Sequence, residues 1–319
     1  MSEISGRSHW PKHFDGNRFY NPGAPEPHGF KDVLRWKLTS RAEASPDFVA
    51  DVQPSKPPAR INGDKLLVTF INHATVLLQT RGVNILTDPI WSQRASPFSF
   101  IGPKRHREPG VRKEDLPEID LVLLSHNHYD HLDLPTLNWL RDRSRNTVFV
   151  VPLRVAEPLR THGIETVHEL DWGEARMVGN TTIYCVPAVH FSARNAFDRN
   201  RTLWCGYVIE SSGGPVYFAG DTAFGDHFAQ IRHRFGVPRL SFLPIGAYQP
   251  RWFMSPVHMS PEEALKAHEI LASRATIGIH HGTFQLADDG IDTPAQQILR
   301  SPHPEQFLIL RNGESVTIE

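Results

Sequence analysis

The stretch that decides the fold is SHNHYDHLD, residues 125–133, which directly follows the apolar run IDLVLL at residues 119–124. It places four candidate ligands within six positions: His126, His128, Asp130 and His131. A strand that ends at a sheet edge and continues into a turn can direct alternating side chains at one point. Imidazole nitrogens and carboxylate oxygens suit zinc, and three protein ligands per ion leave a position for water. The stretch therefore predicts a metal site for two ions, in preference to a histidine-rich surface turn.

Three later residues complete this predicted site, and each follows a β-like run: His190, Asp221 and His280. A lone histidine at a strand end is usually structural, so His190 counts mainly because the first ion lacks a third ligand. Asp221 follows Gly220, which permits a sharp turn, and its two oxygens can bridge two ions. We expect His126, His128 and His190 at one zinc ion. We expect Asp130, His131 and His280 at the other, with Asp221 shared.

Composition bounds the class of protein. The chain has 319 residues, 39% of them hydrophobic, which is enough for one large domain or two small ones. Lys and Arg number 34 against 35 Asp and Glu, and no long block of one sign occurs. This charge pattern argues against a nucleic-acid binder. The 18 histidines exceed ordinary usage and are consistent with ligand roles.

Cysteine usage and the N-terminal residues indicate a cytoplasmic protein. Cys185 and Cys205 lie in apolar, strand-like stretches without metal spacing, so we expect buried free thiols. The N-terminal sequence MSEISGRSHW lacks the apolar core of a signal peptide. No stretch approaches the ~20 apolar residues of a membrane span. Any membrane contact is therefore expected to be peripheral, at the inner membrane surface.

Residues 1–64 differ in character from residues 65–319. Trp10, Phe14, Phe19 and Tyr20 lie among prolines and glycines, and one short helix is expected within residues 31–41. Four further prolines then predict an extended linker. We expect an arm that packs its aromatic side chains on the main domain, residues 65–319. A disordered tail is the alternative, which the aromatic content disfavours.

The pattern from Lys65 onward predicts two sheets. Strands are expected at 66–71, 75–80, 84–87, 119–125, 147–151, 166–170, 181–186, 202–211, 215–219, 240–243, 275–279 and 306–310. Helices are expected at 134–143, 153–161, 226–235 and 264–272, the last opened by a capping box at residues 260–263. A meander followed by βα units, loosely repeated, suits an α+β fold, a four-layer αββα sandwich. Such a sandwich offers several faces for a homodimer, and the oligomeric state is left open.

These motifs resemble the metallo-β-lactamase superfamily. More narrowly, the chain resembles the N-acylphosphatidylethanolamine-hydrolysing phospholipase D family over roughly residues 65–319. The matching segments are 72–76, 86–90, 94–97, 102–105, 125–133, 169–172, 218–222, 244–248, 250–254, 261–264 and 282–284, with a fainter echo at 21–22 and 33–36. The chain departs from the family at His281, where the animal enzyme has tryptophan. It also departs at Asn72, where glycine usually precedes His73, and Asn72 is expected to keep the turn.

The resemblance implies hydrolysis of a glycerophospholipid phosphodiester, with N-acylethanolamine and phosphatidic acid as products. Two zinc ions, or other divalent metals, are the implied cofactors. Asp130 and Asp221 are expected to fix the metals and orient the attacking hydroxide. His258 is the candidate for binding phosphate or protonating the leaving group, with a solvated loop histidine as the alternative. Asp88 and His73 are expected to hold ligand imidazoles by hydrogen bonds, with turn chemistry as the alternative.

Substrate contacts are expected from Arg251, Trp252 and His281. Residues 251–254, RWFM, suit an acyl channel or a lipid-facing rim, or else the core. His281 lies beside a predicted ligand and is an alternative ligand by residue type, although adjacent strand residues point to opposite faces. The basic cluster at residues 104–107 is either a solvated loop or a contact for anionic head groups.

Three other functions remain to be weighed. The nearest is a metal-dependent hydrolase of a soluble phosphodiester or a lactone in the same fold. A dinuclear-iron redox protein usually has a second carboxylate in its metal shell, and His128 at that position favours zinc. A non-catalytic scaffold is disfavoured because all seven expected ligands are present.

Overall fold

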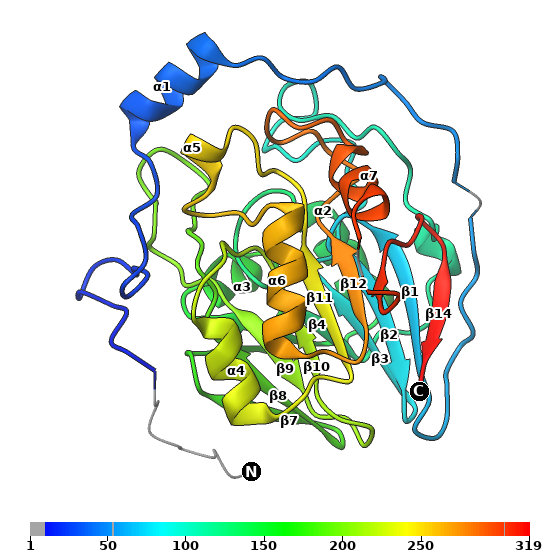
Figure 1. Ribbon diagram of the computed structural model, residues 1–319. Helices are drawn as coiled ribbons and strands as arrows, with labels where there is room; N and C mark the ends of the chain where they lie inside the picture. Colours follow the sequence, from blue (N-terminus) through cyan, green and yellow to red (C-terminus); the bar gives the residue numbers. More distant parts are fainter. Residues whose placement is uncertain (1–9, 53, 303) are drawn as a thin grey trace.

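The computed structural model describes residues 10–52, 54–302 and 304–319, and within them two mixed sheets pack face to face (Figure 1). The first sheet has the order β14 (Ser315–Ile318), β1 (Leu66–Asn72), β2 (Thr75–Thr80), β3 (Val83–Thr87), β4 (Leu121–Leu123), β5 (Val148–Pro152) and β6 (Val167–Leu170). The second has the order β13 (Phe307–Leu308), β12 (Thr276–Ile279), β11 (Leu240–Pro244), β10 (Val216–Phe218), β9 (Gly206–Ile209), β8 (Thr181–Val186) and β7 (Ala175–Val178).

Helices cover the outer face of each sheet. They are α2 (Leu134–Arg143), α3 (Ala156–Thr161), α4 (His227–Phe235), α6 (Pro261–Leu271) and α7 (Thr293–Arg300). The helices α1 (Phe30–Thr39) and α5 (Arg251–Met254) lie instead at one end of the sandwich, where Trp36 and Met254 belong to a separate buried cluster (Figure 1). A 3-10 turn spans Lys113–Asp115. Buried side chains of α2 and α3 form one cluster with the outward-facing residues of β2, β3 and β4. Those of α4, α6 and α7 do the same on β9, β10 and β11. The predicted α+β four-layer sandwich is confirmed.

The core between the sheets follows from alternation along the strands. Val68 and Phe70 of β1 face inward and belong to one buried cluster with Tyr207 of β9 and Phe218 of β10, whereas Ile71 packs outward. Successive residues of a strand point to opposite faces of the sheet. Because one face packs on helices and the other on the second sheet, these strands carry apolar side chains on both faces. The core thus fixes both sheets rigidly beneath the loops at their ends.

Several element boundaries differ from those expected. Residues 119–125 form a strand only at 121–123, because Ser125 donates its backbone N–H to the Asp88 carboxylate instead of a neighbouring strand. Residues 202–211 form a strand only at 206–209, since the amides of Leu203 and Cys205 bond to Leu153 and Ser125. β7, β14 and α7 were not expected. The capping box of α6 is present, with Ser260 accepting from the amide of Glu263.

Residues 10–52 and 54–64 lie along the two-sheet body (Figure 1). His13 contacts Asp171 at 2.7 Å, Trp36 of α1 donates to Asp288 at 2.9 Å, and Arg107 pairs with Asp51 at 2.8 Å. The arm therefore packs on the main domain where it is described, while the division at residue 64 stays a prediction. Among the helices described, none is long and apolar enough to cross a membrane.

Candidate metal centre

The predicted ligands follow the ends of strands that share one edge of the sandwich. The 126–131 stretch follows β4, and Asp88 follows its parallel neighbour β3. Asp221 follows β10 and His280 follows β12, both parallel to β11 between them. Carboxyl ends of parallel strands meet at the same edge, so both sheets present ligands there. Gly220 has φ +60° and an added Cβ would lie 2.6 Å from the Ser125 Cβ, so only glycine fits before Asp221.

The first group of ligand atoms consists of three imidazoles. His126 Nε2 lies 2.8 Å from His128 Nδ1, and His190 Nε2 lies 3.2 Å from the same atom. The Asp221 Oδ2 atom lies 3.9 Å from His126 Nε2 and 3.7 Å from His190 Nε2. These are the residues expected at one ion, together with the shared carboxylate.

The second group joins two carboxylates and two imidazoles. Asp130 Oδ2 lies 3.1 Å from His131 Nε2 and 3.2 Å from His280 Nε2. Asp221 Oδ2 lies 3.2 Å and 3.1 Å from the same two nitrogens. Asp221 is therefore close to both groups. All seven side chains converge, although they span more than 150 positions of the chain.

Two buried atoms test whether this cluster fits a metal. His131 Nε2 forms no hydrogen bond despite its short distances to both carboxylates, and no described residue donates to Asp221 Oδ1. Leaving such atoms unpaired in the interior is costly. Two ligands of a tetrahedral zinc ion, each at about 2.0–2.1 Å, lie about 3.3 Å apart. The observed separations of 3.1–3.2 Å thus fit ligands of a common cation.

The pKa values put most of these groups in ligand form. Burial disfavours charge on Asp130 and Asp221, yet the neighbouring His131 holds the pKa of each carboxyl well below its usual range. Burial lowers the pKa of His128 to about 3 and of His190 to about 4. Carboxylates and neutral imidazoles are the forms that bind metals. The cluster therefore provides ionised carboxylates and, at His126, His128 and His190, neutral imidazoles at neutral pH. Burial opposes charge on His131 and His280, but attraction to Asp221 and Asp130 outweighs it and raises the pKa of His280 to about 9 and that of His131 well above its usual value, so a bound metal would displace a proton from each.

Neighbouring groups fix which imidazole nitrogen faces the cluster. His131 Nδ1 donates to Asp88 Oδ2 at 2.7 Å, and Ser125 Oγ donates to the same oxygen at 2.6 Å. With its proton used, Ser125 Oγ accepts from His126 Nδ1 at 2.8 Å. His190 Nδ1 donates to the Val257 carbonyl at 2.9 Å. In each case Nε2 is the ring nitrogen that faces the centre.

His73 contacts a different partner from the one expected. Its Nε2 lies 2.9 Å from Asp130 Oδ2, so its hydrogen-bond partner is a ligand carboxylate, whereas it meets the ligand imidazole of His280 by ring packing, with centroids 4.2 Å apart. The positive φ of this turn, +52°, also falls on His73, whereas Asn72 is the last residue of β1. Asn72 instead accepts from the buried Arg105 at 3.1 Å.

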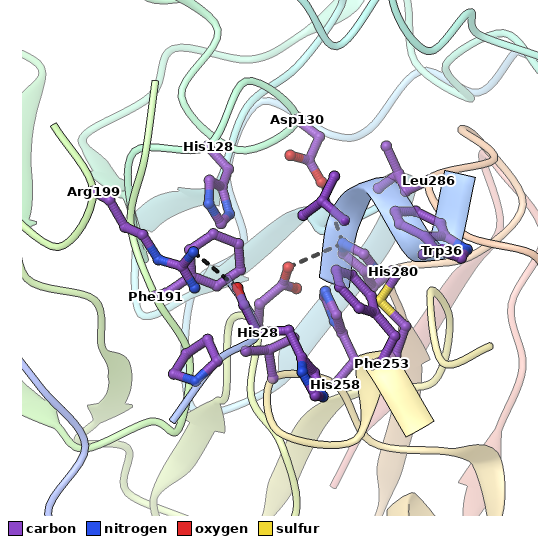
Figure 2. A pocket seen from close by; sticks show the side chains of 15 residues that line it. His28, Trp36, His128, Asp130, Phe191, Arg199, Phe253, His258, His280 and Leu286 are labelled. Atoms are coloured by element: carbon purple, nitrogen blue, oxygen red, sulfur yellow. Dashed lines mark hydrogen bonds and ion pairs between the residues drawn. The ribbon is translucent and has the colours of Figure 1, made fainter. Parts of the chain in front are cut away.

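A cavity of about 300 Å³ opens over the cluster (Figure 2). Its polar lining comes from His128, Asp130, Asp221, His258 and His280. The apolar lining consists of Pro27, Val33, Trp36, Phe191, Phe253, Met254, Val257 and Leu286, and His28 and Arg199 complete it. Figure 2 shows Arg199 on one side and Trp36 with Leu286 on the other, with His128 and Asp130 between them.

Comparison with known proteins identifies the family. Residues 83–281 match the beta-lactamase superfamily domain, from β3 to just beyond His280. The chain belongs to the beta-lactamase superfamily. It is 42% identical over 231 residues to N-acyl-phosphatidylethanolamine-hydrolyzing phospholipase D 1 of Caenorhabditis elegans, covering 69% of this chain and 65% of that protein. The chain therefore spans less than two thirds of that relative's length.

One further relative and one solved structure are similar to the chain. The chain is 32% identical over 226 residues to a metal-dependent hydrolase of Rubrobacter xylanophilus, covering 68% of this chain and 82% of that protein. The crystal structure of a possible metal-dependent hydrolase from Veillonella parvula superimposes with a TM-score of 0.66 at 18% identity, over 79% of this chain and 99% of that one. The latter likeness shows the fold alone. The predicted superfamily and the prediction of a metal-dependent hydrolase are confirmed.

Three residues expected at the substrate lie outside the cavity lining. Arg251 pairs with Glu263 at 2.8 Å and donates to the His258 carbonyl at 3.0 Å. Trp252 is 40% exposed, and His281 stacks on Phe70 with ring centroids 5.6 Å apart. Their proposed substrate contacts stay predictions. No group of ligand atoms found among the described residues includes His281.

The basic cluster at 104–107 is neither a solvated loop nor a head-group contact throughout. Arg105 is 1% exposed and donates to the carbonyls of Ile90 and Ser92. Arg107 is buried and pairs with Asp51 and Asp292. Their long side chains reach into the body because buried carbonyls and carboxylates there need donors. The Lys104 side chain, by contrast, is half-exposed and lies near Asp47.

The sequence did not indicate that residues of the N-terminal arm contact the candidate metal centre and its cavity. Asn21 donates to the His190 carbonyl at 2.7 Å and accepts from Trp204 Nε1 at 2.9 Å. Trp36 and His28 line the cavity. The echo of the family at residues 21–22 and 33–36 was the available signal, but it carried no indication of which strand end these residues contact.

Proposed function

We propose that the protein is a dinuclear zinc phosphodiesterase of phospholipase D type. Its proposed substrate is N-acylphosphatidylethanolamine or a related glycerophospholipid. The observation that carries this proposal is the convergence of seven ligand side chains from both sheets at the base of a cavity with an apolar wall. The similarity to the phospholipase D of C. elegans supports the lipid phosphodiester as substrate class.

Two groups of residues would hold the metals. His126, His128 and His190 would bind one ion, and Asp130, His131 and His280 the other, with Asp221 bridging. Bound zinc ions at such a site lower the pKa of water and neutralise charge on phosphate. The neutral imidazoles around His128, in place of a further carboxylate, favour zinc over a redox iron pair.

The residues of the chain orient the reaction. Asp130 Oδ2 lies 2.9–3.2 Å from Nε2 of His73, His131 and His280, which leaves Oδ1 to accept a hydrogen bond from the attacking water. The water oxygen bonds to phosphorus and the bond from phosphorus to the ethanolamine oxygen breaks. Phosphatidic acid and N-acylethanolamine result. His258 lies in the cavity, 5.0 Å from the His190 ring, where it can donate a hydrogen bond to the phosphate or the leaving oxygen.

Contact with a lipid surface is part of this proposal. Leu38 on α1 is 78% exposed, and Phe100 in the loop after β3 is 77% exposed. Leu34, Phe98 and Ile101 are exposed beside them in sequence. The helix α1 lies at the same end of the molecule as α5, which lines the cavity (Figure 1). Exposed apolar groups at that end suit a bilayer surface. The inner membrane surface as location and a homodimer stay predictions.

The apolar wall distinguishes this proposal from its alternative. Trp36, Phe253 and Leu286 would contact an acyl chain, whereas a soluble phosphodiester or a lactone has no such chain. The cavity is at the low end of ligand-site volumes, so it would hold the reacting end of a lipid while the chains extend outward.

The decisive experiment is product analysis after metal loading. Zinc-loaded protein is incubated with isotope-labelled N-acylphosphatidylethanolamine in mixed micelles, and the products are identified by mass spectrometry. We expect N-acylethanolamine and phosphatidic acid in equal amounts. A soluble bis-nitrophenyl phosphate and a lactone are assayed in parallel. Hydrolysis of either of these without cleavage of the lipid would refute the proposal, as would full activity of protein shown to be metal-free.

A further inference from the structure

Arg199 has an unusual position for a cation. Among the residues described in the cavity lining, it is the single Lys or Arg, and it lies half-buried beside the candidate metal centre (Figure 2). No ion pair joins it to a carboxylate of the described residues. Burial is the main effect on its pKa, which it lowers, with repulsion from Arg18 next. Glu26 attracts the guanidinium and opposes both effects, but no ion pair between the two forms in the structure. Because arginine keeps its proton in proteins, a positive charge lines the cavity.

Two contacts hold the guanidinium in place. Arg199 Nη1 donates to the backbone carbonyl of His28 at 2.9 Å. Its Cζ atom lies 5.2 Å from the centroid of the Phe191 ring, which also lines the cavity. These contacts use one of the five N–H donors of the fork. The remaining donors are available to an oxyanion, which arginine binds through two parallel hydrogen bonds.

The side of the cavity opposite Arg199 is apolar. Val33 and Trp36 from α1, Phe253 and Met254 from α5, and Leu286 form an apolar wall. Figure 2 places Trp36 and Leu286 across the cavity from Arg199, with Asp130 and His128 between. A ligand that satisfies both sides is an amphiphile whose anionic group lies next to an apolar chain.

We propose that Arg199 is the anion-binding residue of this cavity and holds the phosphate of an amphiphilic substrate or product while its acyl chain packs on the α1 and α5 wall. The inference rests on the proposed phosphodiesterase only for the identity of the anion. Arg199 is then a residue that determines substrate specificity without being one of the seven proposed metal ligands. The arm positions it through the His28 carbonyl.

Binding measurements separate this role from catalysis. Zinc-loaded wild type, Arg199→Gln, Arg199→Lys and Arg201→Gln are titrated calorimetrically with dioctanoyl phosphatidic acid and, separately, with inorganic phosphate. Arg201 is exposed and two positions away, so Arg201→Gln removes the same charge from the same segment. We expect Arg199→Gln to weaken binding of phosphatidic acid roughly tenfold or more and Arg199→Lys to weaken it less. Arg201→Gln should bind within about twofold of wild type.

A second pair of measurements distinguishes the lipid from free phosphate. Leu286→Ala is expected to weaken binding of phosphatidic acid but to leave binding of inorganic phosphate unchanged. Arg199→Gln should weaken both. Equal affinity of wild type for the two ligands, together with no effect of Leu286→Ala, would identify a site for free phosphate and overturn the proposal.

Folding is monitored by the thermal unfolding temperature of each variant. If Arg199→Gln releases the arm and lowers that temperature, the comparison uses Arg199→Lys against Arg201→Lys, which retain all charges. Unchanged affinity of phosphatidic acid for a folded Arg199 variant contradicts the assignment, whatever the activity. Wild type that binds phosphatidic acid through Arg199 but cleaves no phosphodiester would contradict the proposed function and support the assignment.

Discussion

At the scale of single residues, Asp88 connects the two groups of ligands. Its carboxylate accepts from His131 Nδ1, from Ser125 Oγ and from the Ser125 amide, and Ser125 in turn fixes His126. One carboxylate thereby orients an imidazole in each group. Since the Asp88 side chain is fully buried, no water can replace these contacts.

Asp88→Asn is expected to lower zinc affinity by about 10–100-fold, the usual effect of removing a group that orients ligands. Asparagine has one acceptor oxygen, and its NH2 group is a donor that would face the donor N–H of His131 or Ser125. The measurement is zinc competition with a chromophoric chelator. Asp47→Asn, at a fully exposed side chain, is the matched control and should bind zinc as wild type. Wild-type affinity in Asp88→Asn would rule out an orienting role.

His258→Ala tests the remaining histidine of the cavity. If His258 contacts the phosphate or the leaving oxygen, the variant keeps both zinc ions, and its turnover falls by about 10²–10⁴-fold. Metal content is measured by mass spectrometry and turnover by release of N-acylethanolamine. His233→Ala on α4, which is exposed, should change neither. Unchanged kinetics in His258→Ala would remove the residue from the mechanism.

At the scale of elements, the arm is held by a titratable contact. His13 donates to the Pro11 carbonyl at 3.0 Å and to Asp171 at 2.7 Å, and it stacks on Trp172. Burial opposes charge on His13, but the hydrogen bonds to Asp171 and Pro11 outweigh it and raise its pKa. A raised pKa in the folded state means that protonated His13 stabilises the docked arm.

The contribution of His13 should therefore be complete below pH 6.5 and be lost as the pH rises through its higher folded-state pKa. We expect His13→Gln to reduce the free energy of unfolding by roughly 1–2 kcal/mol at pH 6 and by less at pH 9. Urea unfolding of both proteins across this range checks the prediction. A difference that stays constant with pH would contradict it, and Asp171→Asn should abolish the pH dependence.

The sequence was informative about elements wherever local patterns dominate. Residues 125–133 predicted a strand-end metal site because ligand spacing is a local property, and the capping box of α6 is local as well. Edge strands β7 and β14 were missed because half-exposed edges lack a clear apolar pattern. The contacts of Asn21 and Arg199 could not be predicted, because they depend on where the arm crosses the two-sheet body. Asn21 contacts His190 and Arg199 contacts His28, and each pair is more than 150 positions apart in the sequence.

At the scale of the whole molecule, the candidate centre joins the two sheets. His126, His131 and Asp130 follow β4 of the first sheet, while His190, Asp221 and His280 follow strands of the second. A ligand that binds only the folded arrangement stabilises it according to its affinity and concentration. Bound metal should therefore hold the sheets together at this edge.

Chelation is expected to lower the thermal unfolding temperature by roughly 5–10 °C, with recovery on addition of zinc. Calorimetric scans with and without a chelator measure this shift. In His280→Ala, which lacks a ligand from the second sheet, the chelator should produce a smaller shift. An unfolding temperature that is indifferent to chelator and to zinc would argue against a metal bound between the sheets.

The cavity wall formed by Val33 and Trp36 belongs to a stretch of chain that contributes none of the seven ligands. Part of the proposed selectivity is thus encoded away from the proposed ligands. Replacing Val33 and Trp36 by the corresponding residues of a relative should alter which acyl chains the proposed enzyme accepts, while the seven ligands and Asn21 are left unchanged.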